Sequence, residues 1–349
     1  MDTVAVDRST QMRGLRQGAY GAPEATGVLE VAEDLARPVP GAGEVLVRVE
    51  AAGLDRGTWH LIRGLPYLYR LAEGPRRPRR QVPGLDYAGV VEAVGAGVDG
   101  LAVGDEVFGT ARGALAEYVA ALPAKLARMP ASLTFAQAAA LPVSAETALH
   151  ALREQGGVQE GQRVLVLGAS GGVGTYAVQL AKVFGAHVTG VCSGPKVALV
   201  RSLGADEVLD YTRSDPTDGS ERYDVVLDIG GNRRLRDLRR ALTPDGTLVI
   251  VGGEEGGPWL GGIDRQVRAV LWSPFLRQRL RMFVAPERRE DLELLASLAD
   301  EGRLVPSIER VVPLEQVAAE LQRMEDGAVR GKVVVTVGTR ADEETGSTS

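Results

Sequence analysis

Short apolar runs alternate with helical stretches through the middle of the chain. Residues 163–174 read RVLVLGASGGVG, an apolar strand followed by a glycine-rich turn, and a helical stretch continues over 173–184. Further runs typical of strands lie at 187–191, 207–209, 224–229 and 247–251, and runs typical of helices lie at 196–203 and 235–242. Strands that are apolar on both faces and alternate with helices indicate a parallel sheet covered on both sides. The pattern predicts an α/β fold with a doubly wound parallel sheet in the centre of the chain.

The turn after the first of these strands has a spacing that suits a dinucleotide pyrophosphate. Gly171 lets the backbone approach the phosphates, Gly174 lets the helix pack close to the strand, and the helix N-terminus offers unpaired N–H groups. Ala169 stands where the fingerprint usually has its first glycine. An ordinary strand-to-helix turn is the alternative, but the complete alternating pattern favours a nicotinamide cofactor. The cofactor contacts predicted in this turn are Ser170, Gly171, Gly172, Val173 and Gly174.

The two ends of the chain have a different pattern. Short strands at 45–49, 89–94 and 105–109, separated by glycine and proline, predict an irregular antiparallel β domain. Strands at 308–312 and 332–337 around a helix at 314–324 are interpreted as returning to that domain. The predicted parts of the chain are a disordered N-terminus at 1–12, a catalytic domain at 13–131 and 286–338, a dinucleotide-binding domain at 132–285, and a disordered polar tail at 339–349.

Charge and composition exclude several classes of protein. The 349 residues contain 40 lysines and arginines against 46 aspartates and glutamates, so no general attraction to nucleic acid is expected. No apolar run of about 18 residues and no signal segment is present, so we expect a cytoplasmic protein without a membrane partner. The single cysteine, Cys192, excludes a disulfide framework and a cysteine-based zinc lobe.

Arginines form two local clusters despite the acidic balance. They lie at Arg76, Arg77, Arg79 and Arg80, and again at Arg233, Arg234, Arg236, Arg239 and Arg240. Solvated surface is one interpretation, and recognition of an anionic substrate group or of a partner is the other.

Five motifs, taken in order, resemble the medium-chain dehydrogenase/reductase superfamily, and most closely its zinc-independent quinone oxidoreductase and enoyl reductase branch. They are AAGLDRGTWHLIRG (51–64), PGLDYAGVVEAVGAGV (83–98), GDEVFGT (104–110), AALPVSAETALHAL (139–152) and GASGGVG (168–174). The resemblance spans roughly residues 13–338. It implies a Rossmann domain in the middle, a GroES-like β-rich catalytic domain formed by both chain ends, and an active cleft at their junction.

Zinc ligands of the family's alcohol dehydrogenases are missing. The positions where those enzymes carry a cysteine, a histidine and commonly a second cysteine hold Asp55, Leu85 and Val143. Catalytic zinc needs three N, S or O ligands from the protein, and neither Leu85 nor Val143 can be one. We therefore expect no metal, and a hydrogen-bonding group in its place.

Candidates for that group follow from the first two motifs. His60 is the first choice as proton donor or relay, with Tyr67 or Tyr87 as alternates and Asp55 as an orienting partner for the imidazole. Each is also compatible with a structural role. Trp59 and Tyr67 are further interpreted as an aromatic wall for a flat substrate.

Cofactor preference is predicted from the end of the second strand of the central domain. Enzymes that use NAD place an acidic side chain there, whereas a 2′-phosphate needs neutral and basic partners. Cys192 holds that position here and Ser193 follows it. Ser193, Lys196 and Tyr211 match residues that contact the 2′-phosphate in NADPH-using relatives, and Arg213 is a further candidate, so NADPH is the predicted cofactor. The other predicted cofactor contacts are Thr147, which resembles a family position near the nicotinamide, with Gly252, Phe283 and Val284.

The leading functional prediction is an NADPH-dependent reductase of an activated C=C bond, in an enone or enoyl thioester, or of a quinone. The alternatives are a zinc-independent alcohol or aldehyde oxidoreductase, and a protein that binds NADPH without turnover. The predicted partner is a small, flat conjugated carbonyl or quinone. Residues 267–280 mix arginines with large apolar side chains, which is compatible with a homodimer surface and, nearly as well, with a lid or packing segment within one chain.

Overall fold

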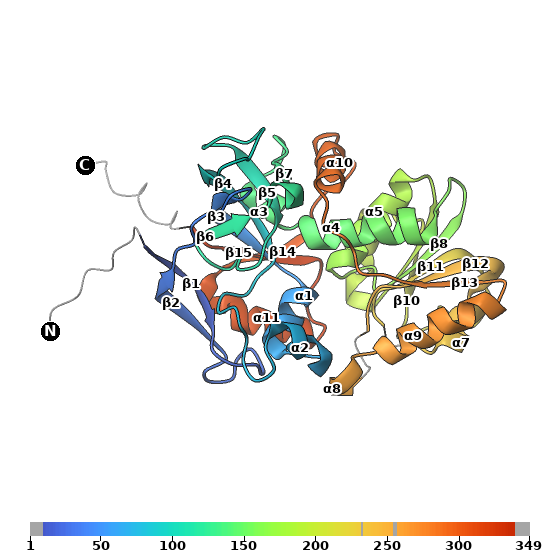
Figure 1. The fold of residues 1–349 in the computed structure, drawn as a ribbon. Helices are drawn as coiled ribbons and strands as arrows, with labels where there is room; N and C mark the ends of the chain where they lie inside the picture. Colours follow the sequence, from blue (N-terminus) through green and yellow to red (C-terminus); the bar gives the residue numbers. More distant parts are fainter. Residues whose placement is uncertain (1–9, 232, 254–256, 339–349) are drawn as a thin grey trace, which may run out of the picture.

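The computed structural model describes residues 10–231, 233–253 and 257–338. Two main β-sheets lie side by side, one built from the middle of the chain and one from both ends (Figure 1). Helices α4 (Pro142–His150) and α10 (Arg289–Asp300) lie between them, and α10 packs against both α4 and β7 (Leu126–Arg128) of the second sheet. The chain thus enters the central sheet through α4 and leaves it through α10.

The central sheet has six parallel strands in the order β10-β9-β8-β11-β12-β13. In β8, Val164 and Val166 join a core with α4 and α5, whereas Leu165 and Leu167 join a second core with α7 and α9. Both faces of the sheet are therefore covered, and the predicted doubly wound fold is confirmed. The elements of this sheet are β8 (Arg163–Leu167), α5 (Gly172–Val183), β9 (His187–Cys192), η4 (Gly194–Lys196), α6 (Val197–Ser202), β10 (Glu207–Asp210), β11 (Tyr223–Asp228), α7 (Leu235–Arg240), β12 (Leu242–Ile250), α8 (Gly257–Leu260), α9 (Ile263–Trp272), η5 (Ser273–Phe275) and β13 (Arg279–Met282).

Several ends of these elements differ from the prediction. β12 begins at Leu242 instead of 247, so α7 already ends at Arg240. The helix predicted from 196 is preceded by the 3₁₀ turn η4, which has a proline in its first turn. Strand β13 was not predicted. Its sequence, RLRM, alternates charged and apolar residues, as is typical of a strand at the edge of a sheet.

The second sheet has the order β14-β15-β3-β4-β5-β7, with β6 paired to β3. Strands β14 and β15 come from the end of the chain, and β15 pairs with β3 from its beginning, so the predicted return to the N-terminal part is confirmed. A separate hairpin is formed by β1 and β2. The strands are β1 (Gln11–Gln17), β2 (Leu29–Ala36), β3 (Val45–Leu54), β4 (Asp86–Val94), β5 (Glu106–Thr110), β6 (Tyr118–Ala121), β7, β14 (Ile308–Pro313) and β15 (Lys332–Thr336).

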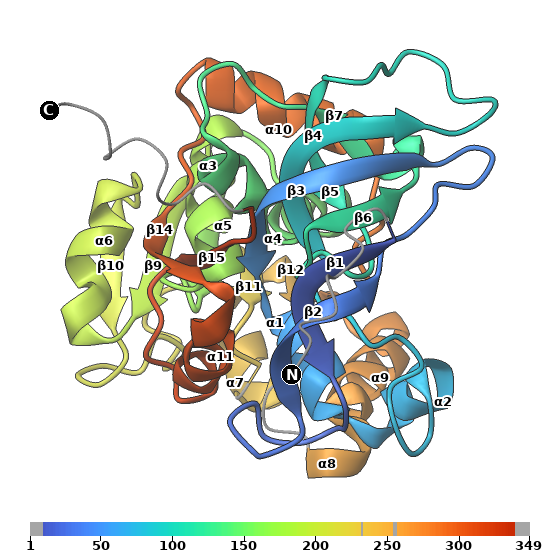
Figure 2. The ribbon, with the colours of Figure 1, turned by 90° about the vertical axis from the view of Figure 1, so that its left-hand side faces the viewer.

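Short helices cover this sheet and connect it to the central one. Helices α1 and α11 bury Ile62 and Leu321 in its core, and Figure 2 shows α11 close to β14 and β15. No helix in the described part of the chain is long and apolar enough to cross a membrane. The remaining helical elements are α1 (Arg56–Arg63), η1 (Tyr67–Tyr69), α2 (Arg70–Glu73), η2 (Pro123–Lys125), α3 (Phe135–Ala139), the π-helical η3 (Ala151–Gly156), η6 (Leu314–Gln316) and α11 (Val317–Glu325).

The predicted disordered N-terminus is too long. Gln11 and Met12 belong to β1, where they pair with Ala36 and Leu35. Met12 is buried in a small core, which explains why the strand starts this early. Residues 1–9 and the predicted tail 339–349 lie outside the described residues. The remaining domain boundaries stay predictions.

The segment 267–280 has features of both a homodimer surface and a segment that packs within its own chain. Ala269 is buried against the central sheet, so part of the segment packs within its own chain. Leu271, Trp272 and Phe275 are exposed, and β13 is the edge strand of the sheet. A homodimer through this surface stays a prediction.

Candidate functional site

The glycine-rich turn connects β8 to α5 with two different kinds of glycine. A Cβ atom on Gly174 would overlap the carbonyl oxygen of Gly168 and lie 2.8 Å from the Cα of Ala169, so only glycine lets helix and strand approach this closely. A Cβ on Gly171 would meet nothing nearer than 3.6 Å. Gly171 is the N-cap of the 12-residue α5 and has no side chain over the helix N–H groups. The turn therefore leaves an open, positively polarised cradle that fits a pyrophosphate.

The end of the chain holds this turn in place. The Gly331 N–H donates to the Ser170 carbonyl at 2.8 Å, and Gly331 forms a bridge with Gly171. A Cβ on Gly172 would lie 3.2 Å from the Lys332 side chain. Strand β15 of the second sheet thus lies directly against the proposed phosphate cradle of the central sheet.

A buried ion pair lies behind the cradle. The Lys332 ammonium donates to Asp86 Oδ2 at 2.9 Å and to the Ser144 hydroxyl at 3.1 Å, and the Val143 N–H donates to Asp86 Oδ1 at 2.9 Å. Burial raises the pKa of Asp86 to about 7, although the Lys332 charge opposes the shift. This pair, whose members are 246 residues apart, was not predicted from the sequence.

The predicted 2′-phosphate contacts lie at the end of β9. Ser193 is half-buried, and Tyr211 is exposed. The Lys196 ammonium donates to the carbonyls of Gly327 (2.8 Å) and Val329 (2.9 Å), so it is oriented by the loop between α11 and β15. Burial lowers the pKa of Lys196. An ammonium has three donors, so one N–H remains for an anion.

A carboxylate that was not predicted from the sequence lies beside these residues. Asp210 pairs across the strands with Cys192, and a Cβ on Gly194 would lie 2.8 Å from Asp210 Oδ2. Its other oxygen accepts from the N–H and hydroxyl of Thr212 at 2.9 and 2.8 Å. These bonds lower the pKa of Asp210 and keep it ionised. The acid absent at Cys192 is therefore partly replaced from the neighbouring strand.

The carboxyl ends of β11 and β12 meet at Gly252. A Cβ there would overlap the Ile229 carbonyl oxygen, so the two strand ends require glycine to come together. Asp228 accepts from Arg265 at 2.7 Å, and Arg265 also donates to the Gly252 carbonyl at 3.2 Å. Burial raises the pKa of Asp228. This arginine fixes the predicted contact Gly252, and neither Asp228 nor Arg265 was predicted.

The three other predicted cofactor contacts differ in exposure. Thr147 is half-buried on α4 and its hydroxyl donates to the Val143 carbonyl at 2.6 Å. Phe283 packs against the core that links the two sheets. Val284, directly after it, is exposed. Their cofactor contacts stay predictions.

His60 lies near the end of α1, and its ring contacts Tyr69 of η1, the turn that also carries Tyr67. Its Nδ1 is 2.8 Å from the Leu65 carbonyl oxygen, and because that oxygen can only accept, Nδ1 carries the proton. The ring is half-buried and makes edge contacts with Trp59 (4.9 Å between ring centres) and Tyr69 (6.0 Å). The imidazole is thus oriented by a backbone carbonyl.

Two of the predicted catalytic residues have other roles. Asp55 is the N-cap of α1: its carboxylate accepts from the Thr58 N–H at 2.7 Å and faces the Thr58 hydroxyl at 3.3 Å, so it does not orient His60. Tyr87 is fully buried in the core of the second sheet, and burial raises its pKa. Its hydroxyl has no hydrogen-bond partner among the described residues, and it cannot contact a substrate outside this core.

Tyr67 is placed where the two halves of the chain meet. Its ring lies 5.1 Å from the ring of Trp259 at an angle of 84°, and Arg70 stacks on its face at 4.6 Å. A Cβ on Gly261 would lie 2.8 Å from Pro66, so the segment after β12 touches η1. Trp59 does not belong to this wall, because its indole N–H donates to Glu325 at 3.2 Å and Arg56 stacks on its ring. The aromatic pair at the junction is Tyr67 with Trp259.

Two family models match the chain: an alcohol dehydrogenase GroES-like domain at residues 41–131 and a zinc-binding dehydrogenase at residues 203–335. The chain is also 31% identical to the chloroplast envelope quinone oxidoreductase homolog of Arabidopsis thaliana, over 93% of this chain and 98% of that protein. The chain belongs to the medium-chain dehydrogenase/reductase superfamily. Within it, the chain lies in the quinone oxidoreductase and enoyl reductase-like branch.

Further medium-chain relatives cover nearly the whole chain. Mouse mitochondrial NAD(P)H oxidoreductase RTN4IP1 is 33% identical over 95% of this chain and 90% of its own, and tomato 2-methylene-furan-3-one reductase is 32% identical over 95% and 81%. Among solved structures, the quinone oxidoreductase from Coxiella burnetii matches with a TM-score of 0.79 and 27% identity, and the CurK enoyl reductase with 0.77 and 26%. Each match covers 94% of this chain and 100% of the other.

The zinc positions of this superfamily do not fit a metal in this chain. Asp55 caps a helix, and a Cβ on Gly57 would lie between Asp55 and the Leu85 methyl group, at 2.9 and 3.2 Å. Leu85 and Val143 have no donor side chain. Within the described ranges, no group of three or more His, Cys, Asp or Glu residues could hold a metal ion. These residues favour a reaction without zinc, which stays a prediction.

Proposed function

We propose that this chain is an NADPH-dependent oxidoreductase that reduces an activated C=C bond of an enone or enoyl thioester, or a quinone, without zinc. One observation carries the proposal. The positions of the family's metal ligands hold a helix cap and two side chains without donor atoms, while an oriented imidazole and an aromatic pair come together at the turn η1. The names of the relatives, a quinone oxidoreductase homolog and a furanone reductase, support the same substrate class.

The cofactor half of the site is formed by the central sheet. The N–H groups at the start of α5 would hold the pyrophosphate, and Gly171 leaves room for it. When bound, the reduced nicotinamide supplies a hydride from C4. Gly252 and the exposed Val284 are the proposed contacts near the nicotinamide end.

NADPH is the proposed form because of the residues at the end of β9. Lys196 is held by two carbonyls with one N–H remaining, and Ser193 with Tyr211 offers hydroxyl groups beside it. Asp210 favours NADH instead, because its ionised carboxylate repels the 2′-phosphate of NADPH. We therefore propose a preference for NADPH that is set by the balance of Lys196 against Asp210.

The substrate half consists of His60 and the aromatic pair. A flat conjugated carbonyl would lie against Tyr67 and Trp259, which come from different parts of the chain. Reduction puts negative charge on the conjugated oxygen, so a donor at that oxygen lowers the barrier. Because Nδ1 of His60 donates to Leu65, the ring can give a proton only at Nε2, as an imidazolium. His60 is thus the proposed acid, and Leu65 the group that orients it.

NADPH oxidation measured with a panel of enones, quinones and simple aldehydes tests this function. Turnover of enones or quinones supports it. Turnover of aldehydes alone points to the alcohol or aldehyde oxidoreductase, and binding of NADPH without turnover points to a sensor or partner protein.

Two histidine variants separate the role of His60 from general damage. His60→Ala should lower enone turnover by about 10²-fold and quinone turnover much less, because solvent can protonate a reduced quinone. His187→Ala is the matched control, since His187 is exposed at the start of β9 and away from the aromatic pair. Equal loss of both activities in His60→Ala would contradict the proposed acid role.

A further inference from the structure

A basic hollow lies on the central domain, away from the site described above. Its volume is about 340 Å³, and its walls come from α7, the start of β12 and the segment before β13. Four arginines line it together with Pro244 and Gln278: Arg236, Arg239, Arg240 and Arg277. Three of the four belong to the second arginine cluster of the sequence, which the proposed reaction does not use.

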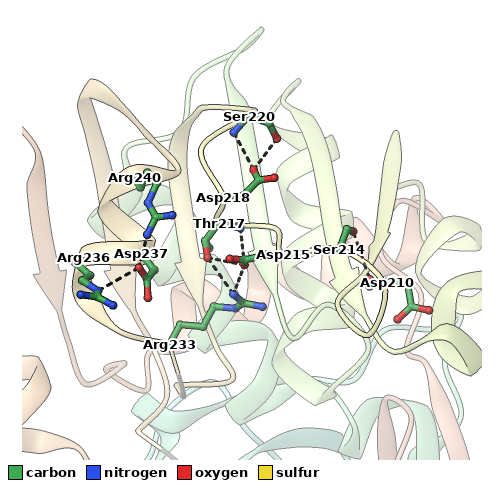
Figure 3. A network of polar contacts seen from close by, with 10 residues as sticks. All are labelled: Asp210, Ser214, Asp215, Thr217, Asp218, Ser220, Arg233, Arg236, Asp237 and Arg240. Atoms are coloured by element: carbon green, nitrogen blue, oxygen red, sulfur yellow. Dashed lines mark hydrogen bonds and ion pairs between the residues drawn. The ribbon is translucent and has the colours of Figure 1, made fainter.

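The positive charge of the hollow is only partly neutralised. Asp237 forms ion pairs with both Arg236 (3.5 Å) and Arg240, as Figure 3 shows. Asp245 accepts two hydrogen bonds of 3.0 Å from Arg277. Two carboxylates thus face four guanidinium groups. Arg236 and Arg240 are also one helical turn apart, and like charges at that spacing repel each other.

Arg239 is the member of this group that lacks a carboxylate. Its side chain is half-buried, and its Nε donates to Gln278 Oε1 at 3.0 Å. The amide of Gln278 in turn donates to the carbonyls of Arg239 (2.9 Å) and Thr243 (3.3 Å). Among the described residues, Arg239 forms no ion pair. A neutral amide therefore fixes a partly desolvated guanidinium, which is the arrangement that favours binding of an oxyanion.

The hollow and the cofactor cradle lie at opposite ends of the same parallel strands. Arg277 and Gln278 precede β13 and Pro244 is near the start of β12, whereas the cradle follows the last residue of β8. In the register of the sheet, Arg279 is level with Thr247, Val225 and Val164. At about 3.3 Å per residue, Gln278 and Gly168 are separated by roughly 17 Å along the strands. An anion in the hollow is therefore not the cofactor.

We propose that this hollow is a second anion site, which binds the phosphate groups of a small oligophosphate. Four arginines with five N–H donors each suit the oxygen-rich, multiply charged phosphate chain better than a single carboxylate. The recognised group is the phosphate chain itself, free or as part of a nucleotide, because the lining residues include no aromatic ring that would stack on a base.

Isothermal titration of the full chain with inorganic tripolyphosphate, at 150 mM NaCl and with saturating NADPH, tests the site. Wild type should bind tripolyphosphate, and Arg239→Gln should bind it about 10- to 100-fold more weakly through loss of a charge-assisted contact. Arg234→Gln is the matched control, because Arg234 is the exposed N-cap residue of α7 and does not line the hollow. It should bind as wild type does.

Titration with ATP under the same conditions distinguishes the two sources of the phosphate chain. Equal affinity for ATP and tripolyphosphate supports recognition of the phosphates alone, and tighter binding of ATP that Arg239→Gln also weakens supports a nucleotide. The proposal is overturned if wild type does not bind tripolyphosphate, or if Arg239→Gln and Arg234→Gln bind it equally well. Unchanged NADPH fluorescence in both variants verifies that they are folded.

Discussion

Replacing Lys332 by methionine removes the cation of the buried pair behind the phosphate cradle. Methionine retains the apolar stem, but Asp86 then keeps only the Val143 N–H as a donor and Ser144 loses its contact. Both Lys332 and Asp86 are almost completely inaccessible to solvent. Removing Lys332 leaves the Asp86 carboxylate unpaired, which destabilises the folded protein unless Asp86 takes up a proton. Because the pKa of Asp86 is already about 7, this proton uptake keeps the charge-related loss small at pH 7.

The loss should grow with pH, which distinguishes it from a simple packing defect. The folded-state pKa of Asp86, about 7, lies above the value near 4 of an exposed aspartate, so the folded protein binds the extra proton. In the wild type, Asp86 makes its full contribution to the free energy of unfolding below about pH 4, and this contribution is lost as the pH rises to 7. Without Lys332 the pKa rises further, so the variant continues to lose about 1.4 kcal/mol per pH unit above pH 7.

Chemical denaturation followed by tryptophan fluorescence at pH 7 and pH 8.5 measures this difference. The gap between wild type and Lys332→Met should widen by up to about 2 kcal/mol over this interval. The double variant Lys332→Met/Asp86→Asn should show no such widening, because the amide has no charge to lose. A gap that is the same at both pH values would refute the reasoning.

Three further predictions concern the cofactor and the metal. Gly171→Ala should fold normally but bind NADPH and NADH more weakly. Gly174→Ala should instead lower the melting temperature, because a Cβ at Gly174 overlaps the Gly168 carbonyl. The reverse pattern in binding and thermal unfolding experiments would contradict the assignment of the turn. Lys196→Ala should weaken NADPH binding roughly 10- to 150-fold and NADH binding far less, and equal losses in fluorescence titrations would place Lys196 in a purely structural role between Gly327 and Val329. Elemental analysis after dialysis should find no stoichiometric zinc, and one zinc per chain would overturn the metal-free site.

Features that depend on neighbouring residues could be predicted from the sequence. The apolar run at 163–167 and the glycines after it determine a strand and a turn locally, so the central fold followed from their pattern. The role of Asp55 was also readable, because an aspartate directly before a helix is a frequent N-cap. Its interpretation as a partner of His60 gave too little weight to that local bond.

Contacts between distant segments could not be predicted in the same way. Lys332 begins an apolar strand, and nothing near it in the sequence indicates a partner 246 residues away. Tyr87 lies in strand β4, which is buried on both faces. The order of apolar and polar residues in such a strand does not show whether a side chain points into the core or toward the junction of the two sheets. Trp259 follows β12 in the sequence and meets Tyr67 only through the packing of α8 on η1.

The transfer of deuterium from NADPH labelled at C4 tests the proposed reaction most directly. After reduction of a simple enone, mass spectrometry and NMR locate the label in the product. The proposed function predicts one deuterium on the β-carbon of a saturated ketone, with the α-position taking its proton from solvent. Deuterium on the carbonyl carbon of an allylic alcohol would contradict it.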